Sequence, residues 1–241
     1  MPILSVEAAI DSEMTPTDAT GNFGDLDLIL LGLQFAGGDK LNLWRPIANF
    51  DVSALVGRQI NDAKLVRHIY AVAGEQPWTA TVYRCKRAEQ WVELEVSWNE
   101  YAAGMLWDTP GAGGPGDVDT VTPTPVTFTE ATDPGDHEIL GMKVFVEDAL
   151  AFRNGLVSIR PQIDDEDYDG TRQASWFSKD NGSDAWRLVI DYSVAGRRSP
   201  LRGRHRRAPV SRPPARPARS ARPAASTRPT RPHHATMRSE R

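Results

Sequence analysis

Short segments rich in β-branched, aromatic and aliphatic residues recur along the chain, with Gly, Pro, Asp and Asn between them. Six of them have the length of a strand: residues 28–33, 63–72, 79–85, 91–98, 156–159 and 187–194. Such residues favour extended backbone, and the residues between them favour turns. Many short strands joined by turn-rich spacers predict an all-β fold, a jelly-roll-like antiparallel β-sandwich.

One segment is a helix candidate. It spans residues 146–152, and Asn154-Gly155 follows as a stop signal. The clearest strand is 187–194, where alternation places Leu188 and Ile190 on one face and Arg187 and Asp191 on the other. The predicted fold is therefore a sandwich with one short helix.

The net charge of −4 averages two unlike parts of the 241-residue chain. Residues 197–241 hold 14 Arg, no Lys and one acid, whereas the preceding residues hold 14 basic and 31 acidic side chains, a formal charge of −17. We predict a folded domain over residues 1–195 and a disordered Arg/Pro-rich tail over 196–241, which has too few apolar residues to form a core. An acidic domain resists association with polyanions.

Three hypotheses compete for the basic tail. Arginines neutralise phosphates without reading bases, so the tail could bind nucleic acid. It could instead be a passive solubilising segment, or an out-of-frame translation of GC-rich DNA, since all its Lys and Arg positions are Arg. The tail therefore carries no functional prediction of its own.

The location of the protein is predicted from weak signals. Apolar runs fall short of the roughly 20 residues of a membrane span, so we expect no membrane span. The opening residues have no basic segment followed by a long apolar stretch, so we expect no signal peptide and synthesis in the cytoplasm. The single cysteine, Cys85, excludes an intramolecular disulfide. We predict that the protein is finally located in a virus particle or at a cell surface, which it would reach by a pathway that requires no signal peptide.

Two loops could hold small ligands. Residues 108–119 (DTPGAGGPGDVD) are rich in glycine but lack the Gly-Lys-Ser/Thr ending of a phosphate loop, so we expect an ordered surface loop. Residues 164–169 (DDEDYD) gather acids, and calcium takes oxygen ligands from such loops. The predicted cofactor set is therefore none, with a structural calcium ion as the alternative. Its candidate ligands are Asp164, Asp165, Asp167 and Asp169.

Seven short motifs follow one another in the order of a known domain family. Residues 15–24 resemble its opening "nPtTNYG" turn, 28–30 its "sLrVG" strand, and 50–65 its "RFDLSaLp…I.sAtL" segment. Residues 83–99 resemble "yrv…WvE…TWN", 145–155 "dVT.lV..w.nG", 177–180 "F.SrE", and 188–192 the closing "L.V.Y" strand. Over residues 5–194 the chain thus resembles the DNRLRE-type β-sandwich family, also described as carbohydrate-binding-module family 96-like domains. It departs from that pattern at Val66-Arg67-His68, where alternation breaks, and at Trp186-Arg187, which replaces Arg-Pro.

The resemblance implies a non-catalytic accessory module. Members are similar to carbohydrate binders beside polysaccharide-degrading enzymes, to surface proteins, or to structural components of phage particles. The implied partners are a polysaccharide or neighbouring protein subunits. Two functions stay open: a carbohydrate-binding or adhesion module, and a purely structural assembly protein of a virus particle without a glycan ligand.

Candidate glycan-binding residues are those that could stack on a sugar ring or pair with an acidic one. Aromatic candidates are Trp78, Tyr101 and Trp107, which border loops. Alternation places Arg84 and Lys86 on one face of their strand, a basic ridge if that face is solvated. No catalytic residue is predicted, because the chain lacks a Gly-x-Ser-x-Gly elbow and an HExxH motif.

Overall fold

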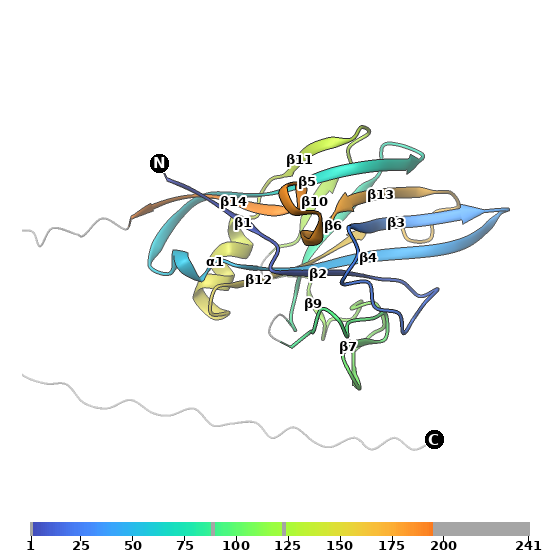
Figure 1. The fold of residues 1–241 in the computed structure, drawn as a ribbon, viewed down its shortest axis with the longest axis horizontal. Helices are drawn as coiled ribbons and strands as arrows, with labels where there is room; N and C mark the ends of the chain where they lie inside the picture. Colours follow the sequence, from blue (N-terminus) through green and yellow to red (C-terminus); the bar gives the residue numbers. More distant parts are fainter. Residues whose placement is uncertain (1, 88–89, 122–123, 195–241) are drawn as a thin grey trace, which may run out of the picture. The chain divides into compact units, whose positions relative to one another are not determined.

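A computed structural model describes residues 2–87, 90–121 and 124–194 of the protein. These residues belong to one compact unit, Met1–Arg197. Every strand pair among them is antiparallel, so the predicted all-β fold is confirmed (Figure 1). The predicted tail, 196–241, lies outside the described residues. None of the helices in the described part of the chain combines the length and apolar character of a membrane span.

The first sheet, sheet A, is built around the long strand β5 (Arg58–Gly74). Its strand order is β1 (Ile3–Glu7), β14 (Arg187–Val194), β5, β13 (Arg172–Phe177), β3 (Leu28–Ala36) and the first half of β4 (Asp39–Asp51). A further strand, β11 (Gly135–Ile139), pairs with the middle of β5. Strands β14 and β13 follow each other along β5, because β14 pairs with its residues 58–66 and β13 with its residues 69–74.

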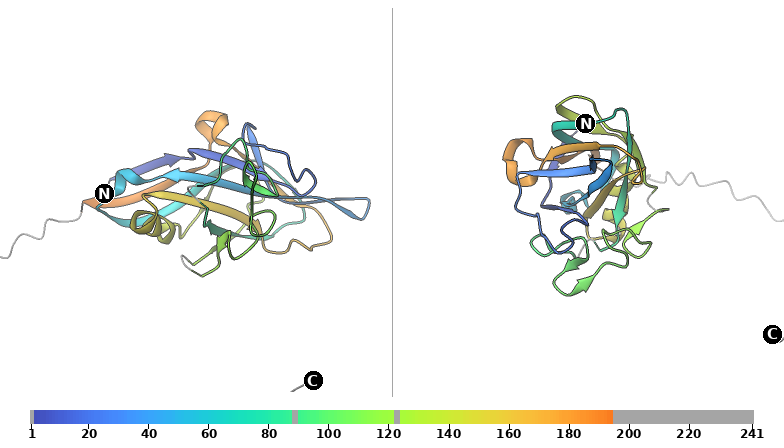
Figure 2. Two further views of the ribbon diagram at one scale, coloured as in Figure 1. Left: turned by 90° about the horizontal axis from the view of Figure 1, so that it is seen from below. Right: turned by 90° about the vertical axis from the view of Figure 1, so that its right-hand side faces the viewer.

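The second sheet, sheet B, begins where β4 leaves sheet A. Its strands are β2 (Ile10–Met14), β4, β12 (Leu156–Ile163), β6 (Thr79–Cys85) and β10 (Val126–Thr129), with β9 (Val118–Asp119) beside β6. Trp44 pairs with β3 in sheet A, whereas Arg45 already pairs with β2 in sheet B. The two sheets are therefore hydrogen-bonded to each other through one shared strand. The end-on view in Figure 2 shows the strands wrapping around a common interior.

The main core lies between the two sheets. Alternate residues of β3, β5 and β12 point into it, among them Leu31, Leu65 and Ile159. Three aromatic rings fill the space beside β14: Trp186 contacts Phe50 edge-on at 5.8 Å and Trp176 at 5.7 Å between ring centroids. Burial of these aliphatic and aromatic faces is the main driving force of the fold.

The predicted helix is present as α1 (Lys143–Phe152). It lies on β5 and β12 and adds Phe145, Val146 and Ala149 to the main core. It ends where Asn154 and Gly155 take positive φ angles of 53° and 82°, as the stop signal predicts. Two short 3-10 turns, η1 (Ser53–Leu55) and η2 (Lys179–Asp184), join strands elsewhere.

The predicted strand over residues 91–98 is wrong. The segment turns on itself, since the amides of Glu95 and Val96 both donate to the carbonyl of Val92. It belongs to a long excursion between β6 and β9 that also contains the small hairpin β7 (Glu100–Ala102) and β8 (Met105–Leu106). Alternating apolar residues are typical of a strand. In this segment, however, Trp91 and Val96 are buried, whereas Val92 and Leu94 are exposed to water.

The excursion covers the outer face of sheet B and forms a second apolar core there. Its members are Met14, Ile47, Cys85, Trp91, Val96, Tyr101, Trp107 and Ala112. Two indole groups of the excursion also form hydrogen bonds. Trp91 donates to the side chain of Asn49 in β4 at 3.0 Å, and Trp107 donates to the carbonyl of Ser97 at 3.0 Å. The outer face of sheet A has no such cover from the described residues, and its middle exposes Tyr70.

A buried ion pair stands inside the main core. The Arg67 side chain follows the inward pattern of Leu65 and Ile69, which explains the irregular alternation at residues 66–68. Its guanidinium lies 2.6 Å from Glu130, with the two residues 1% and 2% exposed. It also faces the rings of Phe128 and Trp176, at 4.8 and 5.1 Å from their centroids. Both charges depend on each other, because removing one leaves the other buried and unpaired.

Glu130→Gln is therefore expected to lower the free energy of unfolding by about 3–5 kcal/mol. The matched control is Glu138→Gln, which removes the exposed pair of Glu138 with Lys64 and should cost less than about 1 kcal/mol. Urea denaturation of both variants measures the difference. Equal, small losses in the two variants would contradict the dependence of Arg67 on Glu130.

Candidate functional site

The glycan-binding candidates from the sequence are mostly buried. Trp78 is 3% exposed in the main core, and Tyr101 and Trp107 are 5% and 4% exposed in the second core. Their rings therefore offer no free face to a sugar. A position beside a loop suggested that these rings are exposed. Tyr101 and Trp107 are nevertheless buried, because the excursion that carries them folds back onto sheet B.

The expected basic ridge is solvated only at Lys86. Alternation along β6 is as predicted, but the face of Arg84 is covered, and that residue is 7% exposed. Arg84 is paired with Asp119 and lies 3.4 Å from Asp148 of α1. Lys86 is exposed, and its ammonium group lies 3.3 Å from Asp119. These charges join the helix and β9 to sheet B.

The glycine-rich loop is ordered by an internal carboxylate. Asp117 is fully buried and accepts hydrogen bonds from the amides of Asp108 at 2.8 Å, Thr109 at 2.9 Å and Gly114 at 3.3 Å. These are the amide groups that a phosphate would need. The protein's own aspartate already occupies them, so the loop has the character of a structural turn.

The four calcium candidates do not converge. Asp164, Asp165, Asp167 and Asp169 are all exposed. Asp164 accepts a hydrogen bond from the Thr81 hydroxyl at 2.7 Å, and Asp165 lies 3.7 Å from Arg172. Within the described ranges, they do not form a group of three acids whose ligand atoms lie within 4.8 Å of one another.

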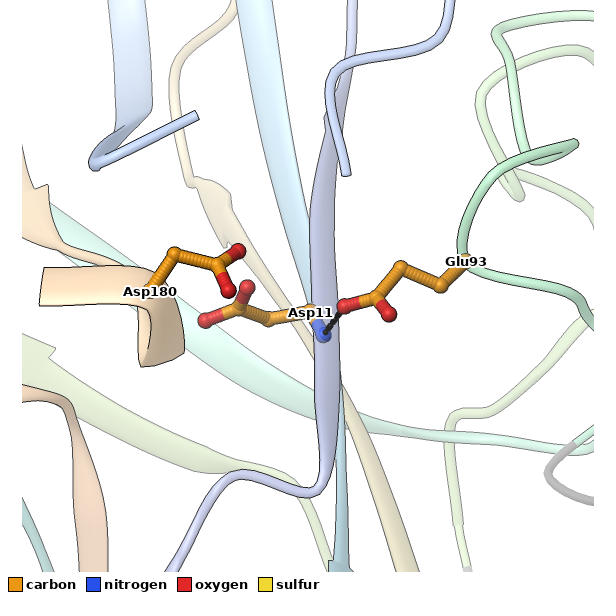
Figure 3. Close-up of side chains that lie close together, drawn as sticks. All are labelled: Asp11, Glu93 and Asp180. Atoms are coloured by element: carbon orange, nitrogen blue, oxygen red, sulfur yellow. Dashed lines mark hydrogen bonds between the residues drawn. The ribbon is translucent and has the colours of Figure 1, made fainter. Parts of the chain in front are cut away.

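A different acidic cluster does converge, at the junction of β2, η2 and the excursion. Asp11, Glu93 and Asp180 bring carboxylate oxygens within 4.8 Å of one another (Figure 3). The ammonium group of Lys179 lies among them, 3.1 Å from Glu93 and 2.7 Å from Asp180. Asp11 accepts hydrogen bonds from the Lys179 amide at 2.8 Å and the Trp186 indole at 2.5 Å. The lysine supplies the positive charge that a metal ion would bring.

The acids of residues 164–169 thus stay apart, and the cluster that converges already contains the Lys179 ammonium group. We expect added calcium or a chelator to leave the melting temperature of the protein unchanged, because a ligand stabilises only the state that binds it. Differential scanning calorimetry in millimolar calcium and in EDTA measures this. A calcium-dependent rise of several degrees in the melting temperature would instead support a metal site in the loop at residues 164–169.

Two acids of β2 are buried with unusual proton affinity. Glu13 is 3% exposed, and burial raises its pKa to about 8, against a smaller opposing effect of the Leu30 amide that donates to it. Burial also raises the pKa of Asp11 to about 6, although the Lys179 and Trp186 hydrogen bonds act in the opposite direction. Both groups therefore make the folded state bind protons that the unfolded chain releases.

Stability should consequently fall as pH rises. Between pH 4.5 and about 8 the unfolded chain loses the Glu13 proton while the native state retains it, so the free energy of unfolding decreases. Glu13→Gln should remove roughly 2–4 kcal/mol of the decrease between pH 5 and 8, since one pKa unit corresponds to about 1.4 kcal/mol. Urea denaturation at both pH values tests this, with Glu7→Gln, an exposed position on β1, as control. An unchanged pH dependence in Glu13→Gln would rule out the buried proton.

The best candidate for a binding site is an aromatic cluster on the uncovered face of sheet A. Phe177 of β13 lies beside two β5 side chains: its ring centroid is 5.2 Å from that of His68 and 5.6 Å from that of Tyr70. Tyr70 is 57% exposed, and the other two are partly exposed. We call these three residues the aromatic platform.

A bulge in β5 presents Tyr70. Ser175 pairs with Ala71 but Trp176 pairs with Ile69, so Tyr70 is an extra residue in β5 at this point. Such an insertion bends a strand and re-aims its side chains. Ile69 and Trp176 remain in the core on one side of the sheet, while Tyr70 projects from the other.

Charged side chains flank the platform. Asp136 of β11 contacts Nδ1 of His68 at 2.9 Å and accepts a hydrogen bond from Arg187 of β14 at 3.0 Å. The pKa of Asp136 is lowered, chiefly by the His68 hydrogen bond and then by Arg187 against the opposing effect of burial. The carboxylate is therefore charged at neutral pH, and Arg187 balances it. Asp136 is 53% exposed in its side chain and open to a ligand.

The platform does not have the geometry of a hydrolase centre. Catalytic histidines pair with a nucleophile on the ring nitrogen that the carboxylate leaves free. Across the described ranges, His68 contacts Asp136 and has no hydroxyl or thiol partner. His137 instead contacts the carbonyl of Asp133 at 2.9 Å through Nε2. Neither histidine is arranged as the base of a triad.

Sequence reasoning missed the platform, although one signal pointed to it. Trp176 and Phe177 are adjacent in a strand, so their side chains must face opposite sides of the sheet. One of the two rings therefore had to leave the core. The sequence did not reveal that Tyr70 and His68, more than 100 positions earlier, meet that ring.

The chain matches no protein-family model, and no curated protein is similar to it at a significant level. The resemblance to DNRLRE-type domains stays a prediction.

Proposed function

We propose that residues 1–194 form a non-catalytic carbohydrate-binding module that holds a polysaccharide on the outer face of sheet A. The observation that carries the proposal is the aromatic platform of His68, Tyr70 and Phe177. The apolar face of a pyranose stacks on such rings, and polar side chains beside them bind its hydroxyl groups. Asp136 and Arg187 are placed to do this.

The form of the face favours a polymer over a small molecule. The platform lies on strands β5 and β13, which are held by neighbours on both sides, so its rings are rigidly presented. A small ligand is usually enclosed in a concave pocket. An open sheet surface instead contacts one side of a long chain, which suits an adhesion or accessory module of a cell-surface or phage assembly.

The charges favour a neutral polysaccharide. The acidic domain repels polyanions at long range. Arg84 and Lys86, which could have bound an acidic sugar, are engaged with Asp119. On the platform itself Arg187 is balanced by Asp136. A ligand with neutral hydroxyl groups therefore meets the smallest electrostatic cost.

Tyr70→Ala is expected to weaken binding to a neutral polysaccharide about tenfold, the equivalent of about 1.4 kcal/mol. The loss should persist from about 0.05 to 0.5 M salt, because stacking is not screened as ion pairs are. Affinity electrophoresis on a panel of neutral and acidic polymers measures it.

The matched control is Phe152→Ala, which removes an aromatic ring that is 78% exposed on α1, away from the platform. This variant should bind as the unaltered protein does. If the unaltered protein is retained by none of the polymers, the carbohydrate proposal is abandoned.

A structural assembly role is the second candidate, favoured by an apolar patch around α1. Val144, Phe152 and Val121 are 40%, 78% and 75% exposed, and they line a shallow hollow of about 420 Å³. Exposed apolar surface of this kind is typical of protein contacts. Phe152→Ser should then abolish concentration-dependent association in sedimentation velocity while leaving glycan retention intact.

A further inference from the structure

The outer face of sheet A contains a hollow of about 350 Å³ in addition to the aromatic platform. The hollow crosses four adjacent strands, in the order β1, β14, β5 and β11 (Figure 1). Lys64 of β5 lines it and points outward, because its neighbours Ala63 and Leu65 point into the main core. The hollow and the platform therefore lie on the same face of the sheet.

The strands that flank the platform continue into the hollow. On β11, Glu138 lines the hollow two positions after Asp136, which contacts His68 of the platform. On β14, Val189 lines it two positions after Arg187, the partner of Asp136. Two positions along a strand correspond to about 7 Å and return to the same face. The hollow thus begins where the charged flank of the platform ends.

Aliphatic side chains form the apolar part of the hollow. Ile3 of β1 and Leu140, the residue after β11, are 69% and 64% exposed. They lie on opposite sides of the hollow, because β1 and β11 are the outer two of the four strands. Val189 of β14 lies between them. The apolar face of a sugar ring loses contact with water when it packs against such side chains.

Carboxylates supply hydrogen-bond acceptors in the same hollow. Asp62 and Asp191 are directly opposite each other in the pairing of β5 with β14. Like charges in this arrangement destabilise a sheet. Among the described residues, no Lys, Arg or His side chain lies within 4.0 Å of either carboxylate, whereas Lys64 pairs with Glu138. The two aspartates therefore offer acceptors to hydroxyl groups and repel an acidic sugar.

We propose that this hollow is a second subsite for the polysaccharide, and that the polymer lies lengthwise along β5. The inference rests on the proposed binding of a neutral polysaccharide at the aromatic platform. A sugar ring in the hollow packs on the aliphatic side chains and donates hydroxyl hydrogens to Asp62 and Asp191. A ligand that reaches from Tyr70 to Asp62 must span about 25 Å, since these positions are eight residues apart in a strand that rises about 3.3 Å per residue. Short oligosaccharides therefore occupy one subsite, and only long ones occupy both.

The test measures affinity as a function of oligosaccharide length. The full chain is first screened by affinity electrophoresis on hydroxyethylcellulose, galactomannan and dextran. Oligosaccharides of the retaining polymer, from the disaccharide to about the decasaccharide, are then titrated by calorimetry. One ligand that engages two linked subsites binds more tightly than a ligand of either subsite alone. We expect the association constant to rise at least about tenfold once the oligosaccharide spans both.

Asp62→Ala/Asp191→Ala should remove this rise and leave the affinity for short oligosaccharides unchanged. Removing the like-charged pair should not destabilise the sheet. Tyr70→Ala should instead weaken the binding of short oligosaccharides as well. The matched control is Glu95→Ala/Glu147→Ala, which removes the same charge from exposed positions on the excursion and on α1, away from sheet A. This variant should keep the rise.

The outcomes separate this subsite from the proposed function. If no polymer retains the unaltered protein, both are overturned. If Tyr70→Ala weakens retention but Asp62→Ala/Asp191→Ala keeps the length dependence, the second subsite alone is overturned. Self-association of the unaltered protein that the double variant abolishes in sedimentation velocity would assign the hollow to a second copy of the chain, and would also overturn the subsite.

A second measurement does not depend on a variant that folds. In nuclear magnetic resonance spectra of the nitrogen-labelled unaltered protein, a short oligosaccharide should shift the backbone amide signals of His68 and Tyr70. A long oligosaccharide should also shift those of Lys64 and Val189. If the long oligosaccharide leaves the signals of Lys64 and Val189 unchanged, the hollow is not a subsite.

Discussion

The shared strand β4 is the constraint on which the rest of the structure depends. Its 13 residues pair with β3 in sheet A and then with β2 and β12 in sheet B. Backbone hydrogen bonds along β4 thus join the two sheets and fix the position of one against the other. The interior so formed must be filled from both sides, which accounts for the concentration of Trp176, Trp186 and Phe50 near its middle.

Each sheet also has an outer face, and the two are used differently. The excursion between β6 and β9 covers sheet B and buries Trp91, Tyr101 and Trp107. Sheet A lacks such a layer in the described part of the chain, and there Tyr70 and Phe177 remain accessible. Apolar surface buried under a loop contributes to stability, whereas the exposed part of a ring on an open sheet does not. Their exposure is therefore the feature that most needs a functional explanation.

Several ionisable side chains are buried, and most of them have a partner that compensates their charge. Arg67 has Glu130, Asp117 has three backbone amides, and Asp11 has an indole and an amide. Glu13 has one amide and retains a proton instead. Arg160 lies against the Tyr83 ring, and burial lowers its pKa to about 9.

The sequence by itself determined the class of fold, the helix with its Asn154-Gly155 stop, and strands such as β6 and β14. These depend on local backbone preference and on alternation, which neighbouring residues express directly. It misassigned residues 91–98, because apolar residues spaced for a strand can also serve a turning segment that packs on a sheet. Only the tertiary structure decided which aromatic side chains are buried and which charges meet. Burial of Trp107 and exposure of Tyr70 depend on whether a distant segment covers that face, and such long-range contacts leave no periodic signal in the sequence.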